Sequence, residues 1–146
     1  MPTPPNTALD MSAGLARELI DAGYEAAISR GVSLSFVVVD RSGTVVASLR
    51  SDGAQLGALS LAEDKAFTAV SFASPTARWS SSSQPGGADW GLVGSLRGRA
   101  SVIPGGVPVV TDNQLIGAIG VSGAASSIDH DCAMAAIESV GLGVES

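Results

Sequence analysis

The 146-residue sequence has few of the residues that cross-link small proteins or bind metals. It contains one cysteine, one histidine, one lysine and six aromatic residues (two Trp, one Tyr, three Phe). A single cysteine excludes an internal disulfide and a zinc site built from cysteines. No apolar run approaches the roughly 18 residues of a membrane span, and residues 1–6 do not resemble a secretory signal. We therefore expect a cytoplasmic protein without a membrane partner.

Positive charge is also scarce, and it is unevenly distributed. The formal net charge is −6, and no lysine or arginine follows Arg99. Binding to nucleic acids or to anionic membranes requires a basic surface. We therefore expect no nucleic-acid partner.

The pattern of apolar residues predicts one α+β domain over residues 8–146, behind a flexible tail of residues 1–7. Apolar residues at helical spacing indicate three helices. The first ends at Gly31, the second begins at Ser60, and the third spans residues 127–141. Hairpin-connected strands favour an antiparallel sheet with the helices packed on it. The expected strands are 34–39 with 44–49, 107–111 with 115–121, and a short strand at 101–103.

The segment 78–99 differs from the rest of the chain. It is rich in serine and glycine and lies between two regular parts of the sequence, with tryptophans at 79 and 90. Loops longer than about 12–15 residues in compact domains are usually functional or disordered, and the tryptophans disfavour disorder. We interpret the segment as a lid or a binding loop.

Six short motifs occur in a recognisable order. They are Val-Val-Asp-Arg-Ser-Gly at 38–43, Arg-Ser-Asp-Gly-Ala at 50–54, Asp-Lys-Ala-Phe-Thr-Ala at 64–69, Gln-Pro-Gly-Gly at 84–87, Gly-Gly-Val-Pro at 105–108 and Gly-Ala-Ile-Gly-Val-Ser-Gly at 117–123. In this order they resemble the haem-binding HbpS-like or GlcG family, which includes the C-terminal domain of PduO-type corrinoid adenosyltransferases. The resemblance covers about residues 8–142. It implies a profilin-like domain with about five antiparallel strands, commonly a homo-oligomer, and haem as a cofactor of some members.

The same motifs predict where a small-molecule ligand binds. We expect a pocket between the end of the second strand, the middle of the second helix, the 84–90 loop and the 105–106 turn. Glycines in these segments allow a ligand to approach the backbone, and Arg50 and Lys65 favour a carboxylate or enolate. The expected ligand-binding residues are Arg50, Asp52, Gly53, Lys65, Gln84, Gly86, Gly87, Trp90, Gly105 and Gly106.

Lys65 is a candidate catalytic residue because it shares a helical face with Leu61, Thr68 and Phe72. An ammonium among apolar neighbours has a lowered pKa and can act as an acid, a base or a Schiff-base amine. The alternative is that its stem packs while its head reaches solvent or a carboxylate. If Lys65 binds the ligand, replacing it with Met should remove binding and change stability by less than about 1.5 kcal/mol.

His130 is the second candidate, as a general acid or base, or as an axial iron ligand if haem is bound. The alternative is an exposed residue in the first turn of the third helix, where Asp129 and Asp131 complement the helix dipole. The sequence lacks Cys-x-x-Cys-His, which excludes covalent attachment of haem. Because iron ligands are scarce, we expect any haem to bind weakly.

Three functions are consistent with these observations. The first is a small-molecule-binding domain, whose ligand by resemblance is haem or a related planar cofactor. The second is a cofactor-independent isomerase, lyase or cyclase that uses Lys65 and His130, so whether the protein is an enzyme stays open. The third is an oligomeric accessory protein. A homo-oligomer is expected because alanine-rich helix faces exceed what one small sheet covers.

Overall fold

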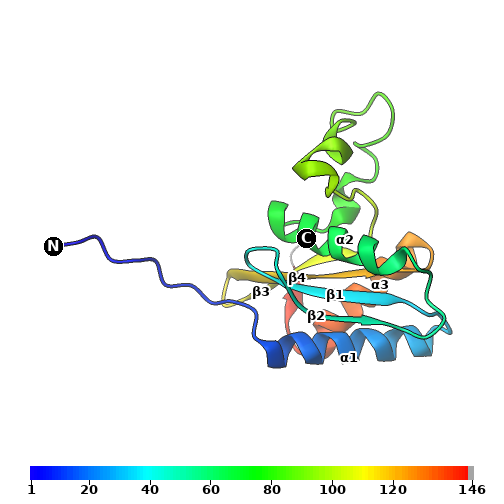
Figure 1. Cartoon of the computed structure of the whole chain (residues 1–146), viewed down its shortest axis with the longest axis horizontal. Helices are drawn as coiled ribbons and strands as arrows, with labels where there is room; N and C mark the ends of the chain where they lie inside the picture. Colours follow the sequence, from blue (N-terminus) through cyan, green and yellow to red (C-terminus); the bar gives the residue numbers. More distant parts are fainter. Residues whose placement is uncertain (145–146) are drawn as a thin grey trace.

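The computed structural model describes residues 1–144, and its centre is an antiparallel sheet built from the two predicted hairpins (Figure 1). β1 (Ser35–Asp40) pairs with β2 (Val45–Arg50), and β3 (Gly106–Thr111) pairs with β4 (Gln114–Ser122). β1 and β4 also pair, so the strand order is β2-β1-β4-β3-β5. β5 (Gly143–Val144) is a two-residue strand beside β3. The antiparallel α+β class is therefore confirmed, with four long strands and one very short edge strand.

Local chemistry explains both hairpin turns. Asp112 and Asn113 both have positive φ, 50° and 60°, which is the conformation of a two-residue turn that matches the twist of the strands. In the other turn, the Asp40 carboxylate accepts hydrogen bonds from the hydroxyl of Ser42 and from the backbone N–H groups of Ser42 and Thr44. The Ser42 hydroxyl is the main reason that the pKa of Asp40 lies below its usual value.

The predicted strand at 101–103 is wrong, because its backbone groups bond to side chains instead of a neighbouring strand. The N–H of Ser101 donates to Thr68 Oγ1, and the carbonyl of Ile103 accepts from Thr76 Oγ1. Pro104 follows and has no N–H to give.

The three predicted helices form, and the second begins earlier than predicted. α1 (Ala13–Ser29) begins after Ser12, whose hydroxyl accepts from the N–H of Leu15, and it ends before Gly31 as predicted. α2 (Ala58–Phe72) begins two residues before Ser60, and the burial of Ala58 explains the earlier start. α3 (Ser126–Ser139) lies close to the predicted range.

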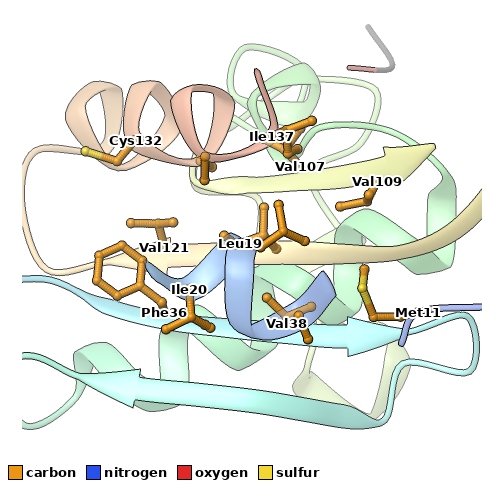
Figure 2. Packing of buried hydrophobic residues seen from close by; sticks show 14 of the residues in the cluster. Met11, Leu19, Ile20, Phe36, Val38, Val107, Val109, Val121, Cys132 and Ile137 are labelled. Carbon is orange, nitrogen blue, oxygen red and sulfur yellow. The ribbon is translucent and has the colours of Figure 1, made fainter. Parts of the chain in front are cut away.

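The helices cover the sheet on both faces. α1 and α3 pack on one face and enclose the larger core, in which Phe36, Val38 and Val121 point toward them (Figure 2). α2 packs on the other face through Ala62, Ala66 and Ala69, all fully buried. The alanine-rich faces of α2 and α3 are thus covered within one chain. The reason given above for an oligomer, that these faces exceed the cover of the sheet, is wrong.

Gly120 shows why α2 lies so close to the sheet. A Cβ at this position would collide with the carbonyl oxygen of Ala62 and would lie 2.7 Å from the N–H nitrogen of Ala66. The strand glycine at this position therefore allows the backbone of α2 to approach the sheet closely.

Residues 76–104, called the arm from here on, project from the body on the α2 side (Figure 1). The arm contains three single-turn 3₁₀ helices, η1 (Thr76–Trp79), η2 (Leu92–Gly94) and η3 (Leu96–Gly98). Thr76 Oγ1 donates to the carbonyl of Ile103 and accepts from the N–H of Gly106, which joins the two ends of the arm. The predicted long loop thus contains short helical turns, and hydrogen bonds to Thr76 hold its two ends together.

The N-terminal residues extend away from the body before the chain docks on the sheet (Figure 1). The N–H of Leu9 donates to Gln114 Oε1, and Met11 is buried. None of the helices in residues 1–144 combines the length and the apolar character that crossing a membrane requires.

Candidate functional site

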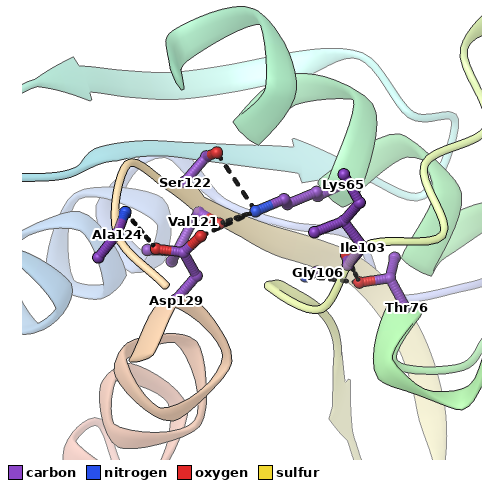
Figure 3. Close-up of polar contacts among 8 residues, drawn as sticks. All are labelled: Lys65, Thr76, Ile103, Gly106, Val121, Ser122, Ala124 and Asp129. Atoms are coloured by element: carbon purple, nitrogen blue, oxygen red, sulfur yellow. Dashed lines mark hydrogen bonds and ion pairs between the residues drawn. The ribbon is translucent and has the colours of Figure 1, made fainter. Parts of the chain in front are cut away.

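Lys65 lies at the centre of a buried polar cluster formed by α2, the end of β4 and the start of α3 (Figure 3). Its Nζ donates to Asp129 Oδ2 at 3.0 Å, to the carbonyl of Val121 at 3.0 Å and to Ser122 Oγ at 3.2 Å. The second carboxylate oxygen of Asp129 accepts from the N–H of Ala124 at 3.0 Å. Three acceptors satisfy the three protons of the ammonium, so the pair is well bonded inside the protein.

The environment of Lys65 favours the structural interpretation over acid/base chemistry. The Lys65 side chain is 1% exposed and that of Asp129 2%. Burial lowers the pKa of Lys65, and the Asp129 carboxylate opposes this shift. Within the described residues the amine is shielded from solvent, and its three protons are already donated.

Gly105 and Gly106 lie against Lys65. A Cβ on Gly105 would come within 2.9 Å of Lys65 Cδ and Nζ, and one on Gly106 would collide with the carbonyl oxygen of Lys65. Gly105 also has φ +134°, a conformation that favours glycine. The structure therefore brings Lys65, Gly105 and Gly106 together, as expected, but the lysine fills the space beside the glycines.

Gln84 lies in a separate surface pocket next to this cluster. The pocket has a volume of about 280 Å³ and is called the Gln84 pocket here. Its lining residues come from the arm and the first residue of α3: Ser80, Gln84, Val102, Ile103, Pro104 and Ser126. Pro104 directly precedes Gly105, so the pocket adjoins the glycine turn from the solvent side.

His130 is half-buried, one helical turn after Ser126 and therefore on the same face of α3. Its Nδ1 is buried and has no hydrogen-bond partner in the described part of the chain. His130 takes part in none of the ion pairs among residues 1–144. The neighbouring Asp129 is paired with Lys65 instead. The alternative of His130 as an exposed first-turn residue is not supported, because the side chain is half-buried, and Asp129 is buried with its carboxylate bonded to Lys65 and Ala124.

The remaining predicted ligand-binding residues lie outside the Gln84 pocket. Arg50 is exposed at the end of the edge strand β2, and Asp52 and Gly53 are exposed in the turn that follows. Arg50 pairs with Ser35, which pairs with Ser122 on its other side. This register places Arg50 two strands away from an acceptor of Lys65.

The arm residues among the predictions also lie outside that pocket. Gly86 is exposed, and Trp90 is 58% exposed. A Cβ on Gly87 would collide with the carbonyl oxygen of Ser82, so this glycine serves a turn within the arm.

Sequence reasoning missed three contributors to the polar cluster: Asp129 as the partner of Lys65, Ser122 as its acceptor and Thr76 at the base of the arm. A buried lysine requires a carboxylate, and this requirement is the one signal for Asp129. Acidic residues are numerous, however, and the sequence does not select among them.

Few side chains in the structure suit a haem iron. Cys132 is fully buried, and burial raises the pKa of its thiol, which disfavours the thiolate. Met11 is buried in the core, whereas Met134 and His130 are half-buried on α3. Residues 1–144 hold no group of three His, Cys, Asp or Glu side chains that suits a metal ion. His130 lies one helical turn after Ser126, a lining residue of the Gln84 pocket, so its imidazole offers haem a single axial ligand.

Comparison with known proteins gives a consistent result. Residues 11–138 match the family described as haem degrading protein HbpS-like. The corrinoid adenosyltransferase PduO of Salmonella typhimurium is 35% identical over 86% of this chain and 38% of its own length. Protein GlcG of Escherichia coli K12 is 33% identical over 80% of this chain and 84% of its own length. This chain thus spans about two fifths of the PduO proteins that it matches.

A solved structure shares the fold almost completely. The crystal structure of the PduOC:Heme complex superposes with a TM-score of 0.89 at 33% identity, and the match covers 94% of this chain and all of the other.

Proposed function

This chain belongs to the HbpS-like family, and from this premise we propose that it is a small-molecule-binding domain whose ligand is haem or a related planar cofactor. The similarity to the PduOC:Heme complex, at 33% identity over 94% of the chain, supports the ligand class. Bound haem supplies a redox-active iron, and the protein supplies the axial ligand and the surface on which the ring lies.

The observation that carries this proposal is the state of His130. Its ring is half-buried, and its Nδ1 makes no hydrogen bond within residues 1–144, so the imidazole is not committed to holding the fold together. Because Nδ1 is occluded, iron would bind the other ring nitrogen. Iron-ligating histidines usually donate their second N–H to an acceptor, and His130 has none. We therefore propose weak ligation.

The Gln84 pocket is the proposed contact surface for part of the ring. Val102, Ile103 and Pro104 offer apolar contact, and the exposed Gln84 offers a polar group. Pockets that enclose drug-sized ligands have volumes of about 300–1,000 Å³. At about 280 Å³ the Gln84 pocket covers part of a macrocycle, which again favours low affinity in a single chain.

A haem titration followed by visible absorption tests the proposal. The purified protein should develop a shifted Soret band that saturates with added haem, and His130→Ala should weaken binding at least tenfold. Asp131→Asn, an exposed neighbour on the same helix, is the matched control and should behave like the natural protein. An unchanged band in His130→Ala would exclude His130 as the ligand. A natural protein that shows no saturable band would contradict haem binding itself.

The other predicted site residues have different roles in the proposed haem site. Gln84 contacts the ligand directly, while Lys65, Gly105 and Gly106 position the pocket from behind. Contacts from Arg50, Asp52, Gly53, Gly86, Gly87 and Trp90 stay predictions that require a second chain or a large ligand. We do not propose the acid/base enzyme, because the Lys65 amine is buried and paired.

We also propose that the protein is a homo-oligomer. Large apolar side chains are exposed on α2 and the arm, among them Leu61, Phe72, Trp90, Val93 and Ile103. Contact with a second copy would remove this surface from water. A profilin-like fold, a single domain over 8–146, a flexible tail over 1–7 and a cytoplasmic location stay predictions.

A further inference from the structure

Phe67 of α2 and Arg99 of the arm form a stacked pair. The Arg99 guanidinium lies 3.7 Å from the centroid of the Phe67 ring. On another side the ring meets the β1–β2 turn, where a Cβ on Gly43 would lie 2.7 Å from Phe67 Cδ2. The ring is therefore held between the turn and the guanidinium.

Two carboxylates lie near the edges of the Arg99 guanidinium. Its Nε lies 3.5 Å from Asp64 Oδ1, and its Nη2 lies 3.7 Å from Glu63 Oε1. The Arg99 side chain is nevertheless 38% exposed. One face of the Arg99 guanidinium covers the Phe67 ring, and its edges lie near the two carboxylates. A ligand can therefore contact the second face of the guanidinium. A planar guanidinium face stacks on aromatic rings.

Arg97 lies beside this pair and has no carboxylate within 4.0 Å in the part of the chain that the structure describes. Leu96 and Arg97 are successive non-glycine residues with positive φ, 53° and 59°. L-residues adopt this left-handed conformation at an energetic cost, and such strain is often found at ligand sites. The strained backbone presents an uncompensated cation next to the stacked pair.

These residues enclose a small pocket, separate from the Gln84 pocket and from His130. Phe67, Leu96, Arg97 and Arg99 line a volume of about 210 Å³. A protein cavity of about 150 Å³ binds benzene, so this volume accommodates one six-membered ring with a small substituent. Glu63 and Asp64 repel a dianion such as a phosphate monoester more strongly than a monoanion, so a monoanion is the better suited anion.

We propose that this pocket binds a small aromatic monocarboxylate, whose ring stacks on Arg99 and whose carboxylate pairs with Arg97. The ring area and the charge are both required for binding. The site shares no residue with the proposed haem surface, so its occupancy does not depend on haem.

An NMR titration of the full chain with benzoate tests this site. Saturable shifts are expected at the backbone N–H groups of residues 96–99 and at the ring of Phe67. Three related compounds should each bind at least threefold more weakly than benzoate. Benzyl alcohol lacks the negative charge, cyclohexanecarboxylate lacks the aromatic face, and phenyl phosphate carries a second negative charge.

Variants at Arg97 decide the role of its charge. Arg97→Asn keeps a residue that tolerates positive φ and removes the cation, and it should weaken benzoate about fivefold or more. Arg97→Lys should recover part of the affinity, and Arg41→Asn, an exposed arginine in the β1–β2 turn, should change nothing. Equal affinity of Arg97→Asn and the natural protein, equal binding of benzyl alcohol, or shifts confined to other residues would each overturn the proposal.

Discussion

The ammonium of Lys65 and the carboxylate of Asp129 meet at 3.0 Å although the two residues are 64 positions apart. Lys65 comes from α2 and Asp129 from α3, which lie on opposite faces of the sheet. Their ion pair therefore links the two helical layers past the end of β4, and the carbonyl of Val121 and the hydroxyl of Ser122 complete it.

Removing one partner of this pair should destabilise the protein strongly. Lys65→Met leaves the Asp129 carboxylate buried without a counter-charge, which typically costs about 3–5 kcal/mol. This replaces the smaller change, below about 1.5 kcal/mol, expected from the sequence. The double variant Lys65→Met/Asp129→Leu should recover most of the loss. Urea unfolding measures the differences, and a Lys65→Met protein of natural stability would contradict the assigned role.

Alkaline pH should raise the free energy of unfolding of the natural protein, because the buried ammonium of Lys65 loses its proton more easily than an ammonium in the unfolded chain. Burial lowers the folded-state pKa of Lys65 below the 10.5 of an ordinary lysine. Between the two values the unfolded chain binds more protons, so the free energy of unfolding rises with pH. The difference in that free energy between the natural protein and Lys65→Met/Asp129→Leu should grow as pH approaches 10.5. A difference that shrinks over this range would mean that the Asp129 carboxylate raises the pKa of Lys65 by more than burial lowers it.

Gly120→Ala should test the contact between α2 and β4. The new Cβ would strike the carbonyl of Ala62, and we expect a loss of about 3 kcal/mol, near the upper end for overpacking. Gly14→Ala is the control, because this helical position has nothing within 4 Å of the added carbon. It should stabilise the protein by roughly 0.5 kcal/mol in the same thermal or urea unfolding experiment. Similar effects of the two changes would argue against the close approach.

Cys132 should resist thiol reagents in the folded protein. Its side chain is fully buried, and burial raises its pKa, so little thiolate is available. Absorbance after addition of Ellman's reagent at pH 8 should stay near baseline without urea and rise to one thiol per chain with urea. Rapid reaction in the native protein would show that α3 opens readily. Cys132→Ala should leave the haem spectrum unchanged.

Association of copies is measured by light scattering at micromolar concentration. We expect a mass above that of one 14.5 kDa chain, because Trp90 and Val93 expose apolar surface on the arm. Trp90→Ser/Val93→Ser should lower the mass if the arm lies in the interface, whereas Arg41→Asn should not. A monomeric natural protein would contradict the oligomer.

The sequence predicted those parts of the fold that depend on neighbours along the chain. Both hairpins follow from turn residues such as Asp112 and Asn113, and α1 ends where Gly31 interrupts it. The strand expected at 101–103 does not form, since Thr68 and Thr76 supply its hydrogen bonds from distant positions. β5 escaped prediction because two residues carry no periodic pattern.

The candidate site was less predictable, because its geometry depends on contacts across the fold. Lys65 stood out as the single lysine within an apolar helix face, but its partner is 64 residues away. The motif glycines 105 and 106 were correctly placed near Lys65, although the space beside them belongs to the lysine. His130 is still a candidate iron ligand because its Nδ1 has no hydrogen-bond partner in the described residues. Only side-chain packing reveals this property.

The hydroxyl of Thr76 has a consequence for how this fold accommodates change in length. It bonds Ile103 and Gly106, so the chain leaves and re-enters the body at one tied point. Lengthening a loop between fixed ends costs free energy that grows only with the logarithm of its length. Insertions or grafted segments between residues 80 and 95 should therefore be tolerated while the sheet keeps its register. The arm is in this sense an exchangeable module on a constant scaffold.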